Sequence, residues 1–299
     1  MLADSSEIVR AAETQHINCN LCGKDDADQI VIQNGYRMVE CRRCGLVYAD
    51  PRPTPELLKE LYNSYHERGS KNESTWQRLM ASNFGEVAAM LAEMLPNKGA
   101  LLDIGCGYGH FIGLMKQQGW AASGIEPSET TCRYAGARGL DVSRTVIEDA
   151  SFPDSAFDAI TAFYVLEHIF DPLAALKKIR AFLKPDGVLV LRLPHTTPVV
   201  KALRLAGIRN NLYDLPFHLY DFSPATITRM LGKAGFTDIK IAPGHPTSPP
   251  DITERLISAF SGKAARFVYF VTGGRILLPG VSKTITARKP AEMRGQFHA

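Results

Sequence analysis

The chain lacks the features that mark membrane-spanning, exported and nucleic-acid-binding proteins. No uninterrupted apolar run reaches the roughly 18 residues that a membrane-spanning helix needs. The net charge is only +3, and lysine and arginine form no dense block, so no nucleic-acid partner is expected. The opening residues, MLADSSEIVR, contain acids and no apolar core, unlike a secretory signal. We therefore expect a cytoplasmic globular protein with one large domain or two modest ones.

Cysteine is scarce and unevenly placed. Four of the six cysteines form two Cys-x-x-Cys pairs near the N-terminus, CNLC and CRRC, and a glycine follows each pair. In a cytosolic chain this pattern favours a metal over disulfides, and four thiolates surround zinc without leaving an open coordination position. Two unrelated reduced pairs or a redox dithiol are the alternatives. We predict a structural zinc module over residues 1–53, with the ligands Cys19, Cys22, Cys41 and Cys44.

Residues 54–98 form an expected helical linker or cap. The run DPRPTP breaks regular structure, and PELLKELYNSYHE after it has apolar residues at helical spacing. Tyr62 and Tyr65 in this run are predicted either to reach a ligand pocket or simply to pack. A second helix is expected from about Trp76 to Leu95, before a PNKG turn.

A glycine turn follows at LLDIGCGYGHF, where an apolar strand leads into a helical pattern. Such turns bring backbone N–H groups up to an anionic or nucleoside ligand. A phosphate-binding P-loop is excluded because no Gly-Lys-Ser/Thr follows, and the third glycine comes one residue early for a dinucleotide fingerprint. Asp-x-Gly-x-Gly-x-Gly fits instead, with Asp103, Gly105, Gly107 and Gly109.

The next apolar run, WAASGIEPS, ends in Glu126. A carboxylate at that place can accept hydrogen bonds from both hydroxyls of a ribose. The alternative is a solvated acid at the end of a strand. Because Pro127 stops the strand directly after it, we favour the ribose role.

Residues 99–194 resemble the class I S-adenosylmethionine-dependent methyltransferases. LLDIGCGYGHF is similar to their first motif, and the stretch from FDAITAFYVLEH through KPDG to LRLPH is similar to the later part of their core. The resemblance implies an α/β fold with a doubly wound, Rossmann-like, seven-stranded sheet. VSKTITARKP would be its last, antiparallel strand, in a methyltransferase domain over residues 99–290 followed by a tail, 291–299.

The same resemblance implies the ligand residues. Asp103 and the turn Gly105–Gly109 would hold the methionine part of S-adenosylmethionine, and Glu126 would hold its ribose. The loop VIEDASF would frame the adenine with Glu148 or Asp149. Phe163 and Tyr164 would lie against the methionine part, although plain core packing is an equal alternative for Phe163.

With the cysteine pairs, the chain is similar to bacterial sugar and small-molecule methyltransferases that carry an N-terminal zinc-binding domain. Their C-methyltransferases of deoxysugars have a Tyr-His-Glu-His-like run, of which LPFHLYDFS keeps only His218, and this argues against sugar C-methylation. Our candidates for a general base are His218 and then His195. His168, in the LEH turn, is assigned a structural role.

The segment 244–280 is an insertion before the last strand. Leu256, Phe260, Ala264, Phe267 and Val271 make a helical apolar stripe, beside basic residues. A lid or a homodimer contact is the preferred interpretation, and a peripheral membrane contact through 254–278 is the other.

The expected function is methyl transfer to O or C of a small-molecule or carrier-linked acceptor, such as a sugar or lipid-linked intermediate. The expected cofactors are S-adenosylmethionine and structural Zn²⁺. The alternatives are a zinc-mediated recruiting or macromolecule-modifying methyltransferase and a non-catalytic cofactor binder.

Overall fold

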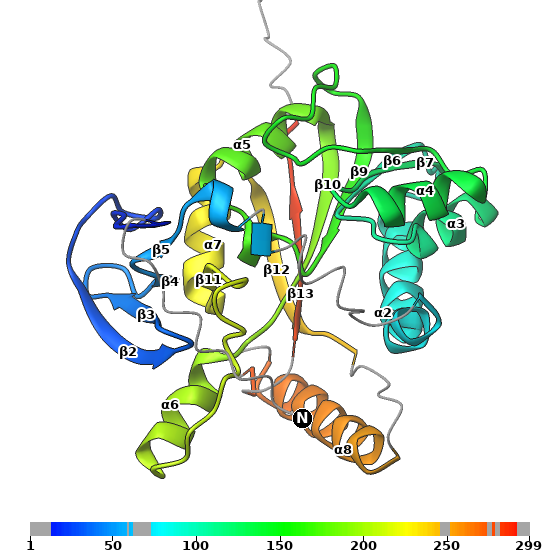
Figure 1. Cartoon of the computed structure of the whole chain (residues 1–299). Coiled ribbons are helices and arrows are strands. Elements are labelled where there is room, and N and C mark those ends of the chain that lie inside the picture. Colours follow the sequence, from blue (N-terminus) through cyan, green and yellow to red (C-terminus); the bar gives the residue numbers. More distant parts are fainter. Residues whose placement is uncertain are drawn as a thin grey trace, which may run out of the picture.

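The computed structural model describes residues 13–58, 60–61, 73–245, 252–273, 277–278 and 282–291. At its centre is a seven-stranded sheet in the order β12-β13-β10-β9-β6-β7-β8 (Figure 1). β13 runs antiparallel to β10 and β12, and the other pairs are parallel, which confirms the expected sheet. The strands are β6 (Ala100–Ile104), β7 (Ala121–Ile125), β8 (Val142–Ser143), β9 (Phe157–Phe163), β10 (Leu183–Leu193), β12 (Thr237–Pro243) and β13 (Lys283–Arg288).

The sheet is covered on both faces because its strands carry apolar residues on both sides. Alternate residues enter different core clusters: Leu102 and Ile160 belong to one, Leu101 and Ala159 to the other. Such continuous apolar runs are typical of parallel strands between helical layers. The helices are α2 (Glu73–Met94), α3 (His110–Gln117), α4 (Glu129–Ala137), α5 (Pro172–Phe182), α6 (Thr197–Leu205), α7 (Pro224–Lys233) and α8 (Ile252–Val271).

Helix starts are encoded locally. Ser128, Asp171 and Ser223 each accept a hydrogen bond from the backbone N–H three residues on, at the first turns of α4, α5 and α7. Proline occupies the first turn of α5 and α7, where its missing N–H costs nothing. These caps fix where the loops at the carboxyl ends of the strands stop.

The N-terminal module contains a second sheet, in the order β11-β4-β3-β2. Its strands are β2 (Ala27–Gln33), β3 (Tyr36–Cys41), β4 (Val47–Ala49) and β11 (Tyr220–Asp221), while β1 (Thr14–Gln15) pairs with β5 (Arg52–Pro53). The sequence did not indicate that β11, which lies far along the chain, completes this sheet through the pair Tyr220–Tyr48. The module therefore shares a sheet with the larger domain.

Within the insertion, α8 is the expected helix, but three members of its predicted stripe do not pack onto the protein. Phe260, Phe267 and Val271 are exposed, while Ala265 is buried. The side chain of Leu256 lies outside the described residues, as do Tyr62, Tyr65, the first twelve residues and residues 292–299. Among the helices of the described residues, none combines the length and apolar character needed to cross a bilayer.

Candidate active site and metal centre

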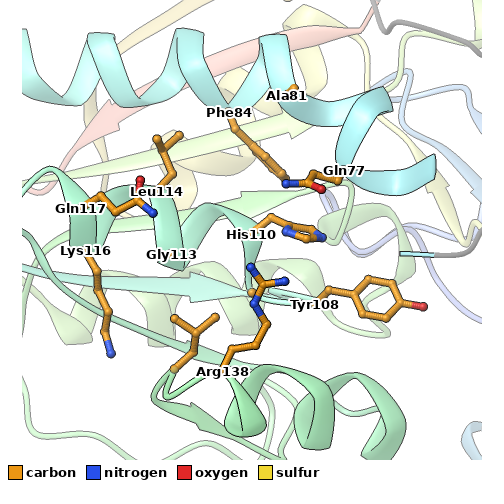
Figure 2. Close-up of a pocket in the computed structure, with 12 residues that line it drawn as sticks. Gln77, Ala81, Phe84, Tyr108, His110, Gly113, Leu114, Lys116, Gln117 and Arg138 are labelled. Carbon is orange, nitrogen blue, oxygen red and sulfur yellow. The ribbon is translucent and has the colours of Figure 1, made fainter. Parts of the chain in front are cut away.

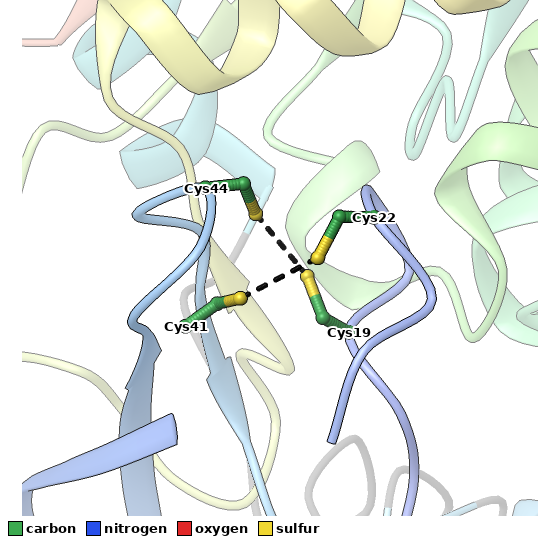
Figure 3. Close-up of side chains that lie close together, drawn as sticks. All are labelled: Cys19, Cys22, Cys41 and Cys44. Atoms are coloured by element: carbon green, nitrogen blue, oxygen red, sulfur yellow. Dashed lines mark hydrogen bonds between the residues drawn. The ribbon is translucent and has the colours of Figure 1, made fainter. Parts of the chain in front are cut away.

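The four predicted zinc ligands come together. Cys19 Sγ lies 3.4 Å from Cys44 Sγ, and Cys22 Sγ lies 3.5 Å from Cys41 Sγ (Figure 3). These separations are far longer than a disulfide bond of about 2.05 Å. All four sulfur atoms lie within 4.8 Å of one another, so the set fits a tetrahedral metal ion.

Glycines shape both knuckles of this cluster. Gly23 has φ 75° and Gly45 has φ 73°, a left-handed conformation that favours glycine. Each glycine N–H donates back to the first cysteine carbonyl of its pair, Gly23 to Cys19 at 2.7 Å and Gly45 to Cys41 at 2.8 Å. The pattern Cys-x-x-Cys-Gly is therefore explained by the turn it has to make.

The glycine turn after β6 is left-handed at all three glycines, with φ of 67°, 52° and 76° at Gly105, Gly107 and Gly109. A Cβ at Gly105 would lie 2.5 Å from Val165 Cγ2, and one at Gly109 would lie 2.6 Å from Leu140 Cδ1. A Cβ at Gly107 would meet nothing within 4 Å. The outer glycines are thus required by packing, whereas the middle one borders open space where a ligand can approach the backbone.

Glu126 lies directly beside that space, at the end of β7. Its Oε2 accepts a hydrogen bond from Gly107 N at 2.9 Å, and its Oε1 accepts one from Ser128 N at 2.9 Å. A carboxylate oxygen can accept two hydrogen bonds, so each keeps acceptor capacity for a hydroxyl. The two residues that were predicted to share a nucleoside ligand are therefore in contact.

Asp103 is buried beneath the turn. Thr161 Oγ1 donates a hydrogen bond of 2.6 Å to Asp103 Oδ1. Burial raises the pKa of the Asp103 carboxyl to about 7, helped by the nearby negative charge of Glu126 and opposed by the Thr161 hydrogen bond. In the absence of a cationic ligand, Asp103 is therefore close to half protonated at neutral pH.

This pKa predicts a pH-dependent stability. Protonated Asp103 contributes to the free energy of unfolding. This contribution is fully present below pH 3.8, the pKa of the carboxyl in the unfolded chain, and is lost as the pH rises through the folded-state pKa of about 7. The unfolding free energy of the wild type, relative to Asp103→Asn, should fall by about 2–4 kcal/mol between pH 4 and pH 8. Urea denaturation at several pH values measures it, with the exposed Asp154→Asn as the control. Parallel curves for wild type and Asp103→Asn would contradict the assignment.

The remaining predicted cofactor residues are placed less uniformly. Phe163 packs between Phe84 and Phe111, with ring centroids 5.1 Å and 4.9 Å away, which is the core interpretation. Tyr164 has φ 58°, and its hydroxyl contacts Arg192 Nε at 2.9 Å. Glu148 and Asp149 are exposed after a buried Ile147, and the described contacts do not join either to the glycine turn.

The histidines fall into two groups. His168 and His218 face each other with ring centroids 4.7 Å apart, and His168 Nδ1 lies 2.9 Å from Phe217 O. Burial lowers the pKa of His168 to about 3 and that of His218 to about 4, so both imidazoles are neutral at pH 7. His195 follows β10 and is buried, and burial lowers its pKa as well.

Glu167 is the acidic residue that sequence reasoning missed. It is fully buried in the short 3₁₀ turn Leu166–His168, and within the described residues neither carboxylate oxygen has a hydrogen-bond partner. Burial raises its pKa to about 8. Its carboxylate and the rings of His168 and His218 lie within 4.8 Å, a set that could also hold a cation. Its signal in the sequence is the LEH turn, where this acid directly precedes His168.

Two further buried charged groups stand behind this cluster. Lys283, at the start of β13, donates to Pro194 O, and burial lowers its pKa to about 8. Asp221, in β11, accepts a hydrogen bond of 2.7 Å from Thr197 N. Both interact electrostatically with Glu167. No local sequence pattern distinguishes Lys283 and Asp221, because the buried groups around Glu167 come from segments that are far apart in the sequence.

A cavity of about 450 Å³ lies on the outer side of the turn, between α2, α3 and the end of α4 (Figure 2). Its walls include His110 and Arg138, which lie 3.0 Å and 3.9 Å from Glu73 Oε1. Of the predicted ligand residues only Gly109 lines it. We therefore place the candidate site at Gly107 and Glu126, on the carboxyl edge of the sheet, where ligands of such folds bind.

The strand order, the antiparallel β13 and the glycine turn with its acidic partner define the class, a Rossmann-like domain of S-adenosylmethionine-dependent methyltransferases. The chain belongs to the methyltransferase-domain family, whose model matches residues 76–241. The methyltransferase expected from the sequence is thereby confirmed at the level of the family.

Relatives and solved structures agree with this assignment. The chain is 35% identical over 133 residues to a ubiquinone biosynthesis O-methyltransferase of Haemophilus ducreyi, a match covering 41% of this chain and 56% of that protein. The chain thus spans about half the length of the curated relatives it matches. A SAM-dependent methyltransferase of Archaeoglobus fulgidus shares the fold with a TM-score of 0.50 and 21% identity, covering 73% of this chain and 100% of that one.

Proposed function

We propose that this protein transfers the methyl group of S-adenosylmethionine to an oxygen atom of a small-molecule acceptor. The observation that carries the proposal is the open space at Gly107, bordered by the Glu126 carboxylate. The sulfonium of this cofactor is already an activated methyl donor. The protein therefore has to align the acceptor with the methyl group and exclude water.

In this proposal Glu126 accepts hydrogen bonds from the ribose hydroxyls, and the turn Gly105–Gly109 approaches the methionine part. Asp103 supplies a carboxyl that ionises when the cofactor's positive charge arrives, since a nearby cation lowers its pKa. Tyr164 borders the methionine part. Glu148 and Asp149 are proposed to face the adenine from the loop after β8.

His218 is proposed as the general base. Like His168 it is only partly buried, unlike Glu167, and its imidazole is 21% exposed, so an acceptor can reach it. Neutral His218 can take the acceptor's hydroxyl proton. Glu167 lies behind it and becomes a stabilising anion once the imidazole is charged, because the new cation lowers the carboxyl pKa. His195 is the second candidate for the base.

The acceptor is proposed to be a hydroxylated metabolite, and transfer to oxygen is favoured over carbon because the curated relatives are O-methyltransferases. Those relatives act in ubiquinone biosynthesis, so phenols related to quinones are the first acceptors to screen. We also propose a cytoplasmic location, because two Cys-x-x-Cys pairs that converge on one point favour a metal centre over disulfides.

We further propose that the zinc module, residues 1–53, is structural and not a recruiting domain. The backbone carbonyls of its knuckles already have partners in the larger domain: Lys233 Nζ donates to Leu21 O at 2.6 Å, and Arg229 donates to Cys44 O. Both donors belong to α7. The knuckles are therefore tied to the methyltransferase domain, residues 99–290, by hydrogen bonds to their backbone, which supports a structural role.

Glu126→Ala tests the cofactor site. Loss of a charged acceptor for the ribose hydroxyls should weaken S-adenosylmethionine binding by about 1.5–3 kcal/mol, roughly 10- to 150-fold in Kd. Calorimetric titration with S-adenosylmethionine and S-adenosylhomocysteine measures the change, and exposed Glu129→Ala is the matched control. Unchanged affinity in Glu126→Ala would remove Glu126 from the site. Absence of binding to the wild type would overturn the proposed function.

A further inference from the structure

Exposed large apolar residues concentrate on two segments of the described protein. Seven of the nine lie on α6 with the loop after it, or on α8. Leu205 is 91% exposed, Phe270 83% and Phe260 77%. We call this the α6/α8 surface; its apolar members are Leu205, Ile208, Leu212, Phe260, Phe267, Phe270 and Val271. Scattered exposed apolar residues are ordinary, but this concentration calls for a partner.

The α6/α8 surface lies at the ligand edge of the central sheet. α6 follows the carboxyl end of β10, and α8 follows that of β12. These strands point the same way, because β13 between them is antiparallel to both. Figure 1 shows α6 and α8 extending from one end of the molecule, the end at which β10 finishes. A partner seated there would cover the approach to the candidate site.

α8 is fixed so that its aromatic side chains point away from the protein. Arg266 Nη2 donates a hydrogen bond of 2.6 Å to Glu86 Oε1 on α2, and the Tyr269 hydroxyl donates to Ile241 O in β12. Ala265 is fully buried on the same side. Phe267 and Phe270 are therefore exposed to solvent, while the opposite face of α8 is held against the protein.

Basic residues outnumber acids on both segments. Residues 197–212 contain three basic residues and no acid, and residues 252–278 contain four basic residues and one acid, Glu254. Arg204, Arg209 and Lys263 are exposed. A second copy placed symmetrically on this surface would bring cations against cations, which disfavours association. An anionic lipid surface is complementary to both the apolar and the basic side chains.

We propose that the α6/α8 surface binds an anionic bilayer, with the aromatic residues of α8 and the apolar residues of α6 inserted at the headgroup boundary. The carboxyl edge of the sheet then faces the membrane, so an acceptor dissolved in the lipid reaches the site without crossing water. The inference stands apart from the catalytic proposal, because binding to vesicles needs neither cofactor nor turnover.

Vesicle flotation at low salt tests the inference with the full chain. The wild type should float with vesicles of phosphatidylcholine and phosphatidylglycerol at least about tenfold more than with phosphatidylcholine alone. Phe267→Ser/Phe270→Ser and Arg209→Glu/Lys263→Glu should each reduce that binding about tenfold. Ile32→Ser, at an exposed apolar residue of β2, should bind as the wild type does.

Vesicle binding can overturn the inference in two ways: the wild type does not bind anionic vesicles, or the variants float as well as the wild type. A wild-type dimer in light scattering that becomes monomeric in Phe267→Ser/Phe270→Ser would also overturn it and would assign the surface to a second copy. Because the exchanged residues are exposed, circular dichroism should show that all variants stay folded.

Discussion

Replacement of Cys41 by serine is expected to unfold the N-terminal module and to carry the damage into the larger domain. Four cysteine sulfur atoms within 4.8 Å of one another would join the two knuckles through the metal we propose. Structural zinc supplies about 10–16 kcal/mol of apparent binding free energy in small zinc-finger peptides, which is then folding free energy. A module this small has few apolar residues to replace such a contribution.

The spread of the damage follows from the shared sheet. β4 pairs with β11, and Ala49 N donates to Leu219 O at 2.8 Å, directly after His218. From the sequence alone, zinc removal is expected to disorder about the first 50 residues and to leave the cofactor site largely intact. The structure instead predicts that the loop carrying His218 loses its support.

Zinc content and hydrogen exchange measure this prediction. Cys41→Ser should lose the stoichiometric zinc of the wild type and should exchange quickly at β4 and β11. Cys132→Ser is the control, since that cysteine lies in α4, away from the cluster. A Cys41→Ser protein with wild-type protection and stability would show that the cluster is not a metal centre.

His218→Asn is expected to lower kcat by about 10²–10⁴ while leaving the Kd of S-adenosylmethionine unchanged. General base catalysis contributes on that scale, and asparagine keeps polarity and approximate size while removing the proton acceptor. The cofactor residues Gly107 and Glu126 have no contact with His218 among the described ones, so binding should be preserved. This split separates a base from a residue that merely supports the fold.

The controls distinguish the members of the cluster. His195→Asn should retain most of kcat if His218 is the base, and the reverse pattern would assign the base to His195. Glu167→Gln should shift the pH dependence of kcat, because it removes the carboxyl that ionises beside the charged imidazole. Wild-type kcat in both histidine variants would contradict base catalysis by either residue.

The parts of the site that follow from sequence are those written in a single local segment. The glycine turn needs a left-handed conformation at Gly105, Gly107 and Gly109, and the cysteine knuckles need one at the glycine directly after each pair. The spacing of these glycines in the sequence therefore reveals both features. The physics of each of these features is local.

The buried charges behind His218 could not be found in this way. Glu167, Lys283 and Asp221 belong to different elements, and only the tertiary fold reveals that Lys283 lies close enough to both acids to interact with them. Phe163 shows the same limit. The sequence left a ligand contact and core packing as equal alternatives, and only the fold shows that its ring packs against Phe84 and Phe111.

The pairing of β11 with β4 also constrains how this protein can be recombined. A hybrid that takes its first 53 residues from another family member and the rest from this chain would have to rebuild the contact between Tyr48 and Tyr220. Strands β4 and β11 are far apart in the sequence but belong to one hydrogen-bonded sheet. Any exchange of the N-terminal module should therefore carry residues 213–221 with it as a cassette.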